Sequence, residues 1–103
     1  MNPAPQLDKV IHPPKRLQIM ALLRNTKAVD FRFLSERLQI RDSDLSKQMR
    51  TLDEAGYVRT MKRGRGPKSS TWFSATAAGR RAYDAHTAAL RTLIAMEAEF
   101  DNG

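Results

Sequence analysis

The 103-residue chain contains no cysteine. It therefore cannot carry disulfide bonds, thiolate-bound metals or a cysteine nucleophile. It also lacks any apolar run close to the roughly 18 residues that a membrane-spanning helix requires. Its first residues show no basic-then-apolar signal pattern, so we expect a cytoplasmic protein. No nucleophile–base pair, pair of acids or phosphate-binding glycine loop can be assembled, and we therefore expect no enzymatic activity.

Acidic residues are scarce relative to basic ones. The chain has 18 lysine and arginine residues against 11 acidic residues, which gives a net charge of +7. This balance is typical of proteins that bind polyanions such as nucleic acid. The excess lies within residues 1–68, whereas residues 69–103 hold three basic and four acidic residues. We therefore expect the C-terminal third to face away from nucleic acid; a basic surface that serves only solubility is the alternative.

The hydrophobic periodicity predicts a mainly helical chain with one β-hairpin. Pro13 and Pro14 favour a helix start, and the run that follows has apolar residues on every side, as in a central, buried helix. Residues 57–63 alternate and residues 71–75 are rich in β-formers, which predicts a hairpin around a loose Gly/Pro/Ser-rich tip. We predict a flexible segment at 1–6, one or two helical turns at 7–12, helices at 15–26, 33–38 and 43–55, an extended segment at 29–31, and a last helix at about 77–99.

The third predicted helix has clear boundary signals. Asp42 or Ser43 can accept hydrogen bonds from the free N–H groups of its first turn. Asp44 can cap the helix or accept from a cytosine amine, and we favour the cap. Gly56 suits the left-handed residue that commonly follows a helix. The helix should therefore run from about 43 to 55.

The same helix carries the pattern of a DNA-reading element. Leu45, Met49 and Leu52 share one side at helical spacing and should pack on the first two helices. The opposite side carries hydroxyl and cationic side chains that can reach base edges or phosphates in a major groove about 12 Å wide. For any single residue a solvated surface explains the pattern equally well, but the set favours DNA. The residues assigned to DNA on and just before this helix are Arg41, Ser43, Ser46, Lys47 and Arg50.

The predicted hairpin concentrates basic residues and has no acid. Like charges crowded on a tight loop repel one another, so a polyanion should neutralise them. Gly64 and Gly66 let the backbone approach a surface closely, and an arginine at such a tip can enter a narrow minor groove. A solvated, disordered loop is the alternative in the free protein. The basic residues are Arg59, Lys62, Arg63, Arg65 and Lys68; we assign the last four to DNA, with Arg63 and Arg65 at the tip.

The last predicted helix has an apolar arc wider than one small domain can cover. Thr76 suits its N-cap. The excess apolar surface should face a second copy of the chain, and a two-fold dimer would place two reading helices in successive major grooves, about 34–36 Å apart. A helix that only folds back on its own core is the alternative. The residues assigned to the dimer contact are Tyr83, His86, Leu90, Leu93 and Ile94.

Three segments of the chain resemble known proteins. The run LSERLQIRDSDLSKQMRTLDEAGYV, residues 34–58, looks like the helix-turn-helix core of bacterial and archaeal winged-helix regulators. Residues 12–23 look like their first helix, and residues 76–83 look like the Thr-x-x-Gly-Arg turn that follows their wing. Over about residues 10–95 the chain resembles short, single-domain MarR/ArsR-like transcriptional regulators.

The resemblance implies an α+β, mainly α, winged helix-turn-helix fold with a two-stranded wing and a long C-terminal dimerisation helix. It implies a dimeric DNA-binding regulator, often a repressor, with the third helix in the major groove and the wing at the minor groove. Gln39 stands where a glycine is common, which predicts a strained or altered turn, and Ala75 replaces a common core leucine. Residues 7–103 should form this single domain.

Some ArsR-like relatives sense metals through their last helix, and Asp84 and His86 resemble half of that pattern. Glu97 stands where the matching histidine would be needed. Two histidines without cysteine leave too few ligands for zinc. We therefore expect no metal and no cofactor, and the sequence indicates no particular small-molecule effector.

Two functions stay open at this point. The first is a sequence-specific transcriptional regulator whose partners are double-stranded DNA and a second copy of the chain, with no membrane partner. The second is a winged helix used for protein interaction or for non-specific nucleic-acid binding. The basic hairpin and the exposed side of the third helix favour the first.

Overall fold

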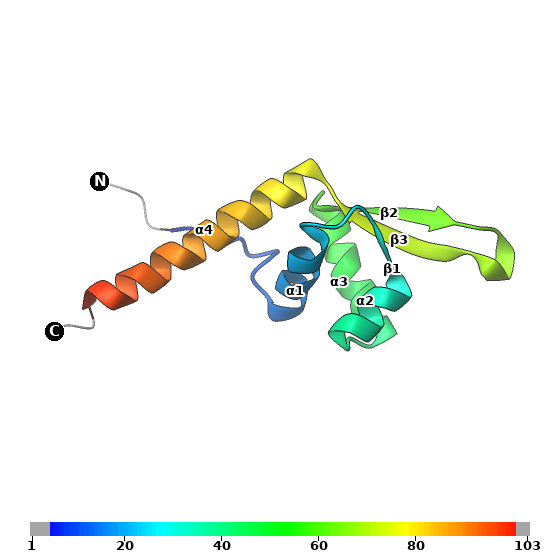
Figure 1. Cartoon of the computed structure of the whole chain (residues 1–103), viewed down its shortest axis with the longest axis horizontal. Coiled ribbons are helices and arrows are strands. Elements are labelled where there is room, and N and C mark those ends of the chain that lie inside the picture. The colour runs from blue at the N-terminus through cyan, green and yellow to red at the C-terminus, as the bar shows by residue number, and fades with distance from the viewer. Residues whose placement is uncertain (1–4, 101–103) are drawn as a thin grey trace.

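The computed structural model describes residues 5–100. Residues 1–4, which make up most of the segment expected to be flexible, and residues 101–103 lie outside the described residues. The molecule is elongated, 62 × 25 × 20 Å, with a β-hairpin at one end and a projecting helix at the other (Figure 1). The elements are α1 (Pro14–Leu23), β1 (Val29–Asp30), α2 (Phe31–Leu38), α3 (Asp42–Glu54), β2 (Val58–Arg63), a 3-10 turn (Gly66–Lys68), β3 (Ser70–Ala75) and α4 (Ala77–Phe100).

The central helix is α1, as the sequence predicted. Pro13 is its N-cap and Pro14 its first residue, where the fixed φ of proline suits the helix and the missing N–H breaks no hydrogen bond. Ile19, Met20 and Leu23 are fully buried. They form one core with apolar residues of α2, α3 and the sheet.

The turn between α2 and α3 is tight and contains a left-handed residue. Asp30 caps α2, because its carboxylate accepts a hydrogen bond from the N–H of Phe33 at 2.7 Å. The helix ends at Gln39, whose φ is +54°, so the predicted strain at this position takes the form of a left-handed conformation. The Ser35 hydroxyl donates to the carbonyl of Ile40 at 2.9 Å, and the buried Ile40 side chain fixes the turn to the core.

The first turn of α3 differs from the prediction. Arg41 is the N-cap, and its side chain makes no capping hydrogen bond. The predicted caps at Asp42 and Ser43 are wrong, because the extended backbone ends at Arg41 and both residues already lie inside the helix. At the other end, Gly56 has φ +79°, which confirms the predicted left-handed residue after the helix.

The sheet has three antiparallel strands in the order β1-β3-β2. The predicted hairpin consists of β2 and β3, with Val58 opposite Ala75 at its base. A third strand, β1, joins the hairpin because Val29 in the extended segment before α2 pairs with Phe73. The tip, expected as a loose loop, closes through the 3-10 turn at Gly66–Lys68.

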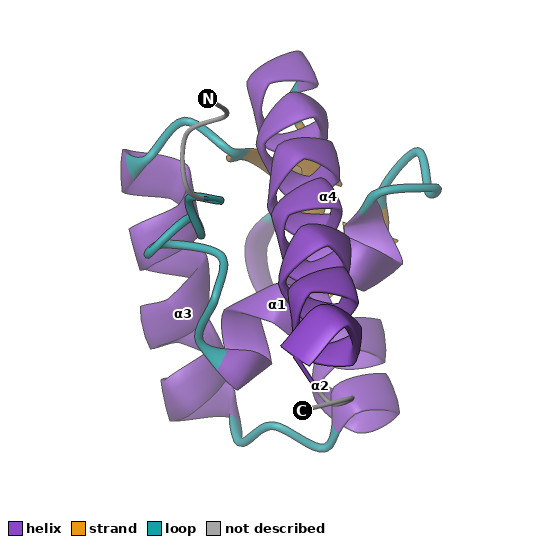
Figure 2. Cartoon of the chain, turned by 90° about the vertical axis from the view of Figure 1, so that its left-hand side faces the viewer, coloured by secondary structure: helices purple, strands orange, loops and turns teal. Residues whose placement is uncertain are grey.

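The long helix α4 begins against the core and then leaves it. The Thr76 hydroxyl accepts a hydrogen bond from the N–H of Gly79 at 3.0 Å, which confirms the predicted N-cap. Gly79 lies so close to Tyr57 that a Cβ there would stand 2.1 Å from the Tyr57 carbonyl oxygen. Residues 91–100 are exposed and project beyond the body. Figure 2, seen from the projecting end, shows α4 in front of the three shorter helices.

Residues 8–12 form a single turn, which we call the N-terminal strap. The Asp8 carboxylate accepts a hydrogen bond from the N–H of Ile11 at 3.1 Å, and the Ile11 side chain is fully buried. The N–H of Asp8 donates to Nδ1 of His86 at 3.0 Å, and the Tyr57 hydroxyl donates to the Asp8 carboxylate at 2.7 Å. The strap therefore connects α4 to the body of the molecule.

Candidate nucleic-acid interface

The two sides of α3 differ as the helical spacing predicted. Leu45, Met49 and Leu52 are buried in the common core. The opposite side presents hydroxyl donors and cations to solvent, and within residues 5–100 no ion pair engages Lys47 or Arg50. The exposed predicted residues of this surface are Arg41, Ser43, Ser46, Lys47 and Arg50.

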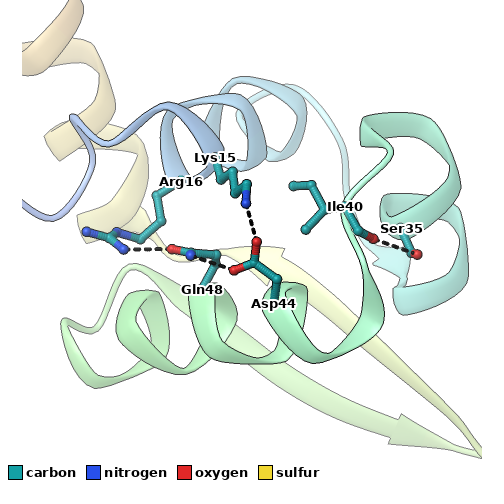
Figure 3. A network of polar contacts seen from close by, with 6 residues as sticks. All are labelled: Lys15, Arg16, Ser35, Ile40, Asp44 and Gln48. Atoms are coloured by element: carbon teal, nitrogen blue, oxygen red, sulfur yellow. Dashed lines mark hydrogen bonds and ion pairs between the residues drawn. The ribbon is translucent and has the colours of Figure 1, made fainter.

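Asp44 does not have the capping role that was favoured for it. Its carboxylate faces α1, pairs with the Lys15 ammonium, and accepts a hydrogen bond from the Gln48 amide at 2.9 Å (Figure 3). The Lys15 contact, followed by the Gln48 hydrogen bond, lowers the pKa of Asp44, so the carboxylate is charged at neutral pH. The predicted cap is wrong because the side chain is directed toward α1 rather than toward the free N–H groups of its own first turn.

Gln48 extends this contact into a network between helices. The Arg16 guanidinium of α1 donates to the side-chain oxygen of Gln48 at 2.6 Å (Figure 3). The Nε of Arg16 donates to the carbonyl of Val10 in the N-terminal strap. These contacts hold α3 against α1 from its inner side and leave its outer side open to a partner.

Two cations of the hairpin are held by their neighbours. The Arg63 guanidinium lies 4.2 Å from the centre of the Trp72 ring, a cation–π contact. The Trp72 indole N–H donates to the Ser70 hydroxyl at 2.8 Å, and the Lys62 ammonium donates to the Thr71 hydroxyl at 2.7 Å. Both cations are therefore oriented before any partner binds. The exposed basic residues of the hairpin are Arg59, Lys62, Arg63, Arg65 and Lys68.

Trp72 and Asp8 were not identified from the sequence as supporting residues. Alternate residues of a strand share one side of a sheet, and Trp72 lies opposite Met61, two residues before Arg63. Once this register is known the Arg63–Trp72 contact follows, but the sequence does not provide the register. The contacts of Asp8 with Tyr57 and His86 join residues far apart in the chain, so no local pattern indicates this role.

A cleft lies between α3 and the hairpin. Ser46 and Arg50 line it from α3, Thr60 lines it from β2, and Asp53 and Glu54 also contribute to its lining. The Asp53 carboxylate accepts a hydrogen bond from the Thr60 hydroxyl at 2.9 Å. Carboxylates repel phosphate groups, so Asp53 and Glu54 make the C-terminal end of α3 unfavourable for a polyanion, whereas the hairpin carries no acid.

The residues assigned to a dimer contact occupy different environments. Tyr83 and Leu90 are partly buried by their own chain. Leu93 and Ile94 are 37% and 65% exposed. His86 is only 1% exposed, because the N-terminal strap covers it. The structure therefore does not bring His86 to the open surface that Leu93 and Ile94 share.

The candidate metal residues also have other partners. Asp84 forms two hydrogen bonds of 2.9 Å with the Arg24 guanidinium, and these lower the pKa of Asp84. Within residues 5–100 no three histidine, aspartate or glutamate side chains come together as a metal-binding group.

A helix-turn-helix whose second helix exposes donors and cations, followed by a basic hairpin, defines the winged-helix class of DNA-binding domain. The family model described as a winged helix DNA-binding domain matches residues 15–94, and the chain belongs to this family. The family is one of DNA-binding domains, and the fold is shared with solved structures that are described as transcriptional regulators. In the described part of the chain, no helix is both long enough and apolar enough to cross a membrane.

Similar proteins are found among archaea and bacteria. An uncharacterized protein from Methanocaldococcus jannaschii is 31% identical over 75 residues, which cover 73% of this chain and 82% of that protein. A transcriptional regulator homologue from Pyrococcus horikoshii superposes with a TM-score of 0.77 at 24% identity, covering 82% of this chain and 84% of that chain. A putative transcriptional regulator from Salmonella typhimurium superposes with a TM-score of 0.70 at 20% identity, covering 88% and 80%. These similarities confirm the predicted winged-helix fold.

Proposed function

We propose that this protein is a homodimeric regulator that binds specific sequences of double-stranded DNA and represses transcription. It would act in the cytoplasm, the compartment that holds the DNA of a prokaryotic cell. Residues 7–103 would form one functional unit that comprises the DNA-binding domain and the dimerisation helix.

The outer side of α3 is the observation that carries the proposal. Its short side chains, Ser43 and Ser46, lie near the N-terminus of the helix, where they allow close approach to the floor of a major groove. Lys47 and Arg50 follow one turn later and are exposed, so each can reach a guanine edge or a phosphate. The helix N-terminus adds a partial positive charge that favours a backbone phosphate.

The hairpin supports a second contact with the same duplex. It directly follows α3, and the cleft between the two is lined by residues of both. Arg65 is exposed at the start of the tip turn, and Arg63 is oriented on Trp72. A basic tip beside a reading helix suits the minor groove next to the major groove that the helix occupies.

The end of α4 supports dimerisation. The apolar stripe of this helix is covered by its own chain as far as Ala89, which is 9% exposed. It continues beyond the body as an open surface, with Ile94 at 65% and Phe100 at 77% exposure. A contiguous apolar surface on a projecting helix is typical of a subunit contact. A two-fold pair would direct both α3 helices to one side of the dimer, and a bound dimer would block access of polymerase to a promoter.

Selection of bound sequences from a pool of random duplexes tests the proposal. A dimer predicts enrichment of a two-fold motif with half-sites about 10–10.5 base pairs apart. Affinity for the selected duplex should fall about 10³–10⁵-fold between 50 and 200 mM salt if some 6–10 phosphates are contacted. Binding without sequence enrichment would instead indicate a non-specific nucleic-acid module, and no binding to any duplex would indicate a protein-interaction module.

A further inference from the structure

His86 is an enclosed imidazole that the proposed DNA-binding surfaces do not use. It is 1% exposed, and its Nδ1 accepts a hydrogen bond from the backbone N–H of Asp8 at 3.0 Å. Its Nε2 lies 3.3 Å from Nδ1 of His12, and the two rings meet edge to face. The only two histidines of the chain therefore meet where the N-terminal strap contacts α4.

The hydrogen bonds define the protonation of both rings. Because Nδ1 of His86 accepts from Asp8, a neutral His86 carries its hydrogen on Nε2. This hydrogen is directed at Nδ1 of His12, which must accept it, so a neutral His12 also carries its hydrogen on Nε2. If Nδ1 of His12 were the donor instead, both nitrogens of His86 would accept hydrogen bonds and carry no hydrogen, which a neutral imidazole does not allow. A proton added to Nδ1 of either ring would place two donors face to face.

We propose that the His12–His86 contact is a proton-sensitive latch, which holds the N-terminal strap on α4 while both rings are neutral and loosens when either ring takes up a proton. Two donors directed at each other lose the hydrogen bond, and because His86 is buried while His12 is exposed, the imidazole of His86 is the group left unsatisfied. Ile11 is fully buried in the core next to this contact, so proton uptake weakens the docking of the strap without removing it from the body.

The groups around the pair set the direction of the pKa shift of His86 and the pH range in which the latch responds. Burial, and then the neighbouring His12, lower the pKa of His86 from its ordinary 6.5 against the attraction of Asp8. The stabilisation from the latch is therefore complete above about pH 6.5 and is lost as the pH falls from there toward the lowered pKa. Asp8 and His12 of the strap lie next to His86. Tyr57 reaches this site by its hydrogen bond to Asp8, and Arg16 by its hydrogen bond to the carbonyl of Val10. Asp84, which is also on α4, is paired with Arg24.

Asp8 keeps its charge through this range. Burial raises its pKa, but hydrogen bonds from the Tyr57 hydroxyl and from the N–H groups of Ile11 and Val10 bring the pKa of Asp8 below its ordinary 3.8. A change in the strap between pH 7 and 5.5 therefore reports on the imidazoles and not on this carboxylate.

The latch also has a structural route to α3. Arg16 donates one hydrogen bond to the carbonyl of Val10 in the strap and another to the side chain of Gln48 on the inner side of α3. A loosened strap removes one of the two acceptors that orient Arg16. We therefore expect acidification to weaken DNA binding through the position of α3, a step that rests on the proposed function.

Imidazole nitrogen NMR on the unmodified protein tests the latch without DNA. At pH 7.5 both rings should show the tautomer with hydrogen on Nε2, and the midpoint of His86 should lie below that of a free imidazole. Exchange of the amide hydrogens of Asp8 and Ile11, corrected for the intrinsic pH dependence, should accelerate about tenfold between pH 7.5 and 5.5. An Nδ1–H tautomer at His86, or amide protection that does not change with pH, would overturn the proposal.

The double variant His12→Gln/His86→Gln removes the titration and keeps groups that donate and accept. Its amide protection in the strap should be the same at both pH values, whereas the control Lys9→Gln, an exposed strap residue, should keep the native response. A pH response that persists in the double variant contradicts the latch. If the double variant does not fold, the tautomer measurement on the unmodified protein still decides.

Affinity for the selected duplex at pH 7.5 and 5.5 tests the route to α3. The native protein should lose about fivefold in affinity on acidification relative to the double variant. Equal pH dependence in the two proteins would contradict the coupling. Absence of duplex binding at pH 7.5 would instead contradict the proposed function and leave the tautomer and exchange results as the test of the latch.

Discussion

Gln39 holds the turn between α2 and α3 in a left-handed backbone conformation, with φ at +54°. This conformation costs a residue with a Cβ about 1–2 kcal/mol, whereas glycine adopts it without a clash. Glycine also loses more entropy on folding, which offsets part of the gain. We expect Gln39→Gly to raise the free energy of unfolding by about 0.5–1 kcal/mol, measured by urea denaturation. Gln39→Ala, which keeps a Cβ, should leave it nearly unchanged; equal effects of both variants would argue against strain.

Glycine is required at position 79 because there is no space for a side chain, and not because of its backbone conformation. A Cβ at this position would lie 2.1 Å from the carbonyl oxygen of Tyr57, a backbone atom that cannot rotate away. Gly79→Ala should therefore force α4 away from the turn before β2 and lower the free energy of unfolding by about 1–3 kcal/mol. Ala78→Ser, at the exposed neighbouring position, is the control and should change it by less than about 0.5 kcal/mol. A stable Gly79→Ala protein would show that this contact is not tight.

Among the elements, α3 is expected to carry sequence discrimination. Arg50 is exposed on its outer side and lines the cleft beside the hairpin. If Arg50 contacts a guanine edge, Arg50→Ala should cost about 1–3 kcal/mol on the selected duplex and relax the preference at one base pair. Fluorescence anisotropy with the selected and a scrambled duplex measures this. Arg91→Ala removes the same charge from the exposed end of α4 and serves as the control. An Arg50→Ala protein with full affinity and selectivity would mean that α3 does not read the DNA through this residue.

The hairpin is expected to contribute affinity with little sequence preference. Arg65 is exposed at the start of the tip turn, where it can reach phosphates or the minor groove. Arg65→Ala should weaken binding to selected and scrambled duplexes to a similar extent and reduce the slope of log affinity against log salt by about 1. A loss confined to the selected duplex would assign base recognition to the hairpin instead.

At the scale of the whole molecule, the open end of α4 predicts a dimer that one substitution can dissociate. Ile94 is 65% exposed in the single chain, so Ile94→Glu should leave the fold intact but bury an unpaired charge in a subunit contact, which is strongly unfavourable. Sedimentation equilibrium should show a monomer, with the helical circular dichroism signal of the native protein. Ala95→Glu adds the same charge at an exposed position on the side of the helix away from the apolar residues and should stay dimeric. An Ile94→Glu protein that dimerises as the native one does would place the contact elsewhere.

The predicted elements were found because each depends on neighbours in the chain. The spacing of Leu45, Met49 and Leu52 indicated which side of α3 is buried, and Gly56 and Thr76 marked where helices end and begin. The wrong assignments concern contacts across the fold. Asp44 was assigned to a cap, but Lys15, which lies 29 residues earlier, attracts its carboxylate. His86 shares the helical stripe of Leu93 and Ile94, but the N-terminal strap covers it and leaves the other two exposed.

The sequence by itself determined the order of helices and strands, the buried and exposed sides of α3, and the concentration of positive charge on the hairpin. Periodicity, capping and charge density are local properties, so a short stretch of sequence is enough to predict them. Only the tertiary structure decided the pairing of β1 with the hairpin, the stacking of Arg63 on Trp72, and the meeting of His12 with His86. These contacts join residues up to 74 positions apart, and their partners are selected by packing and register, which no local pattern encodes.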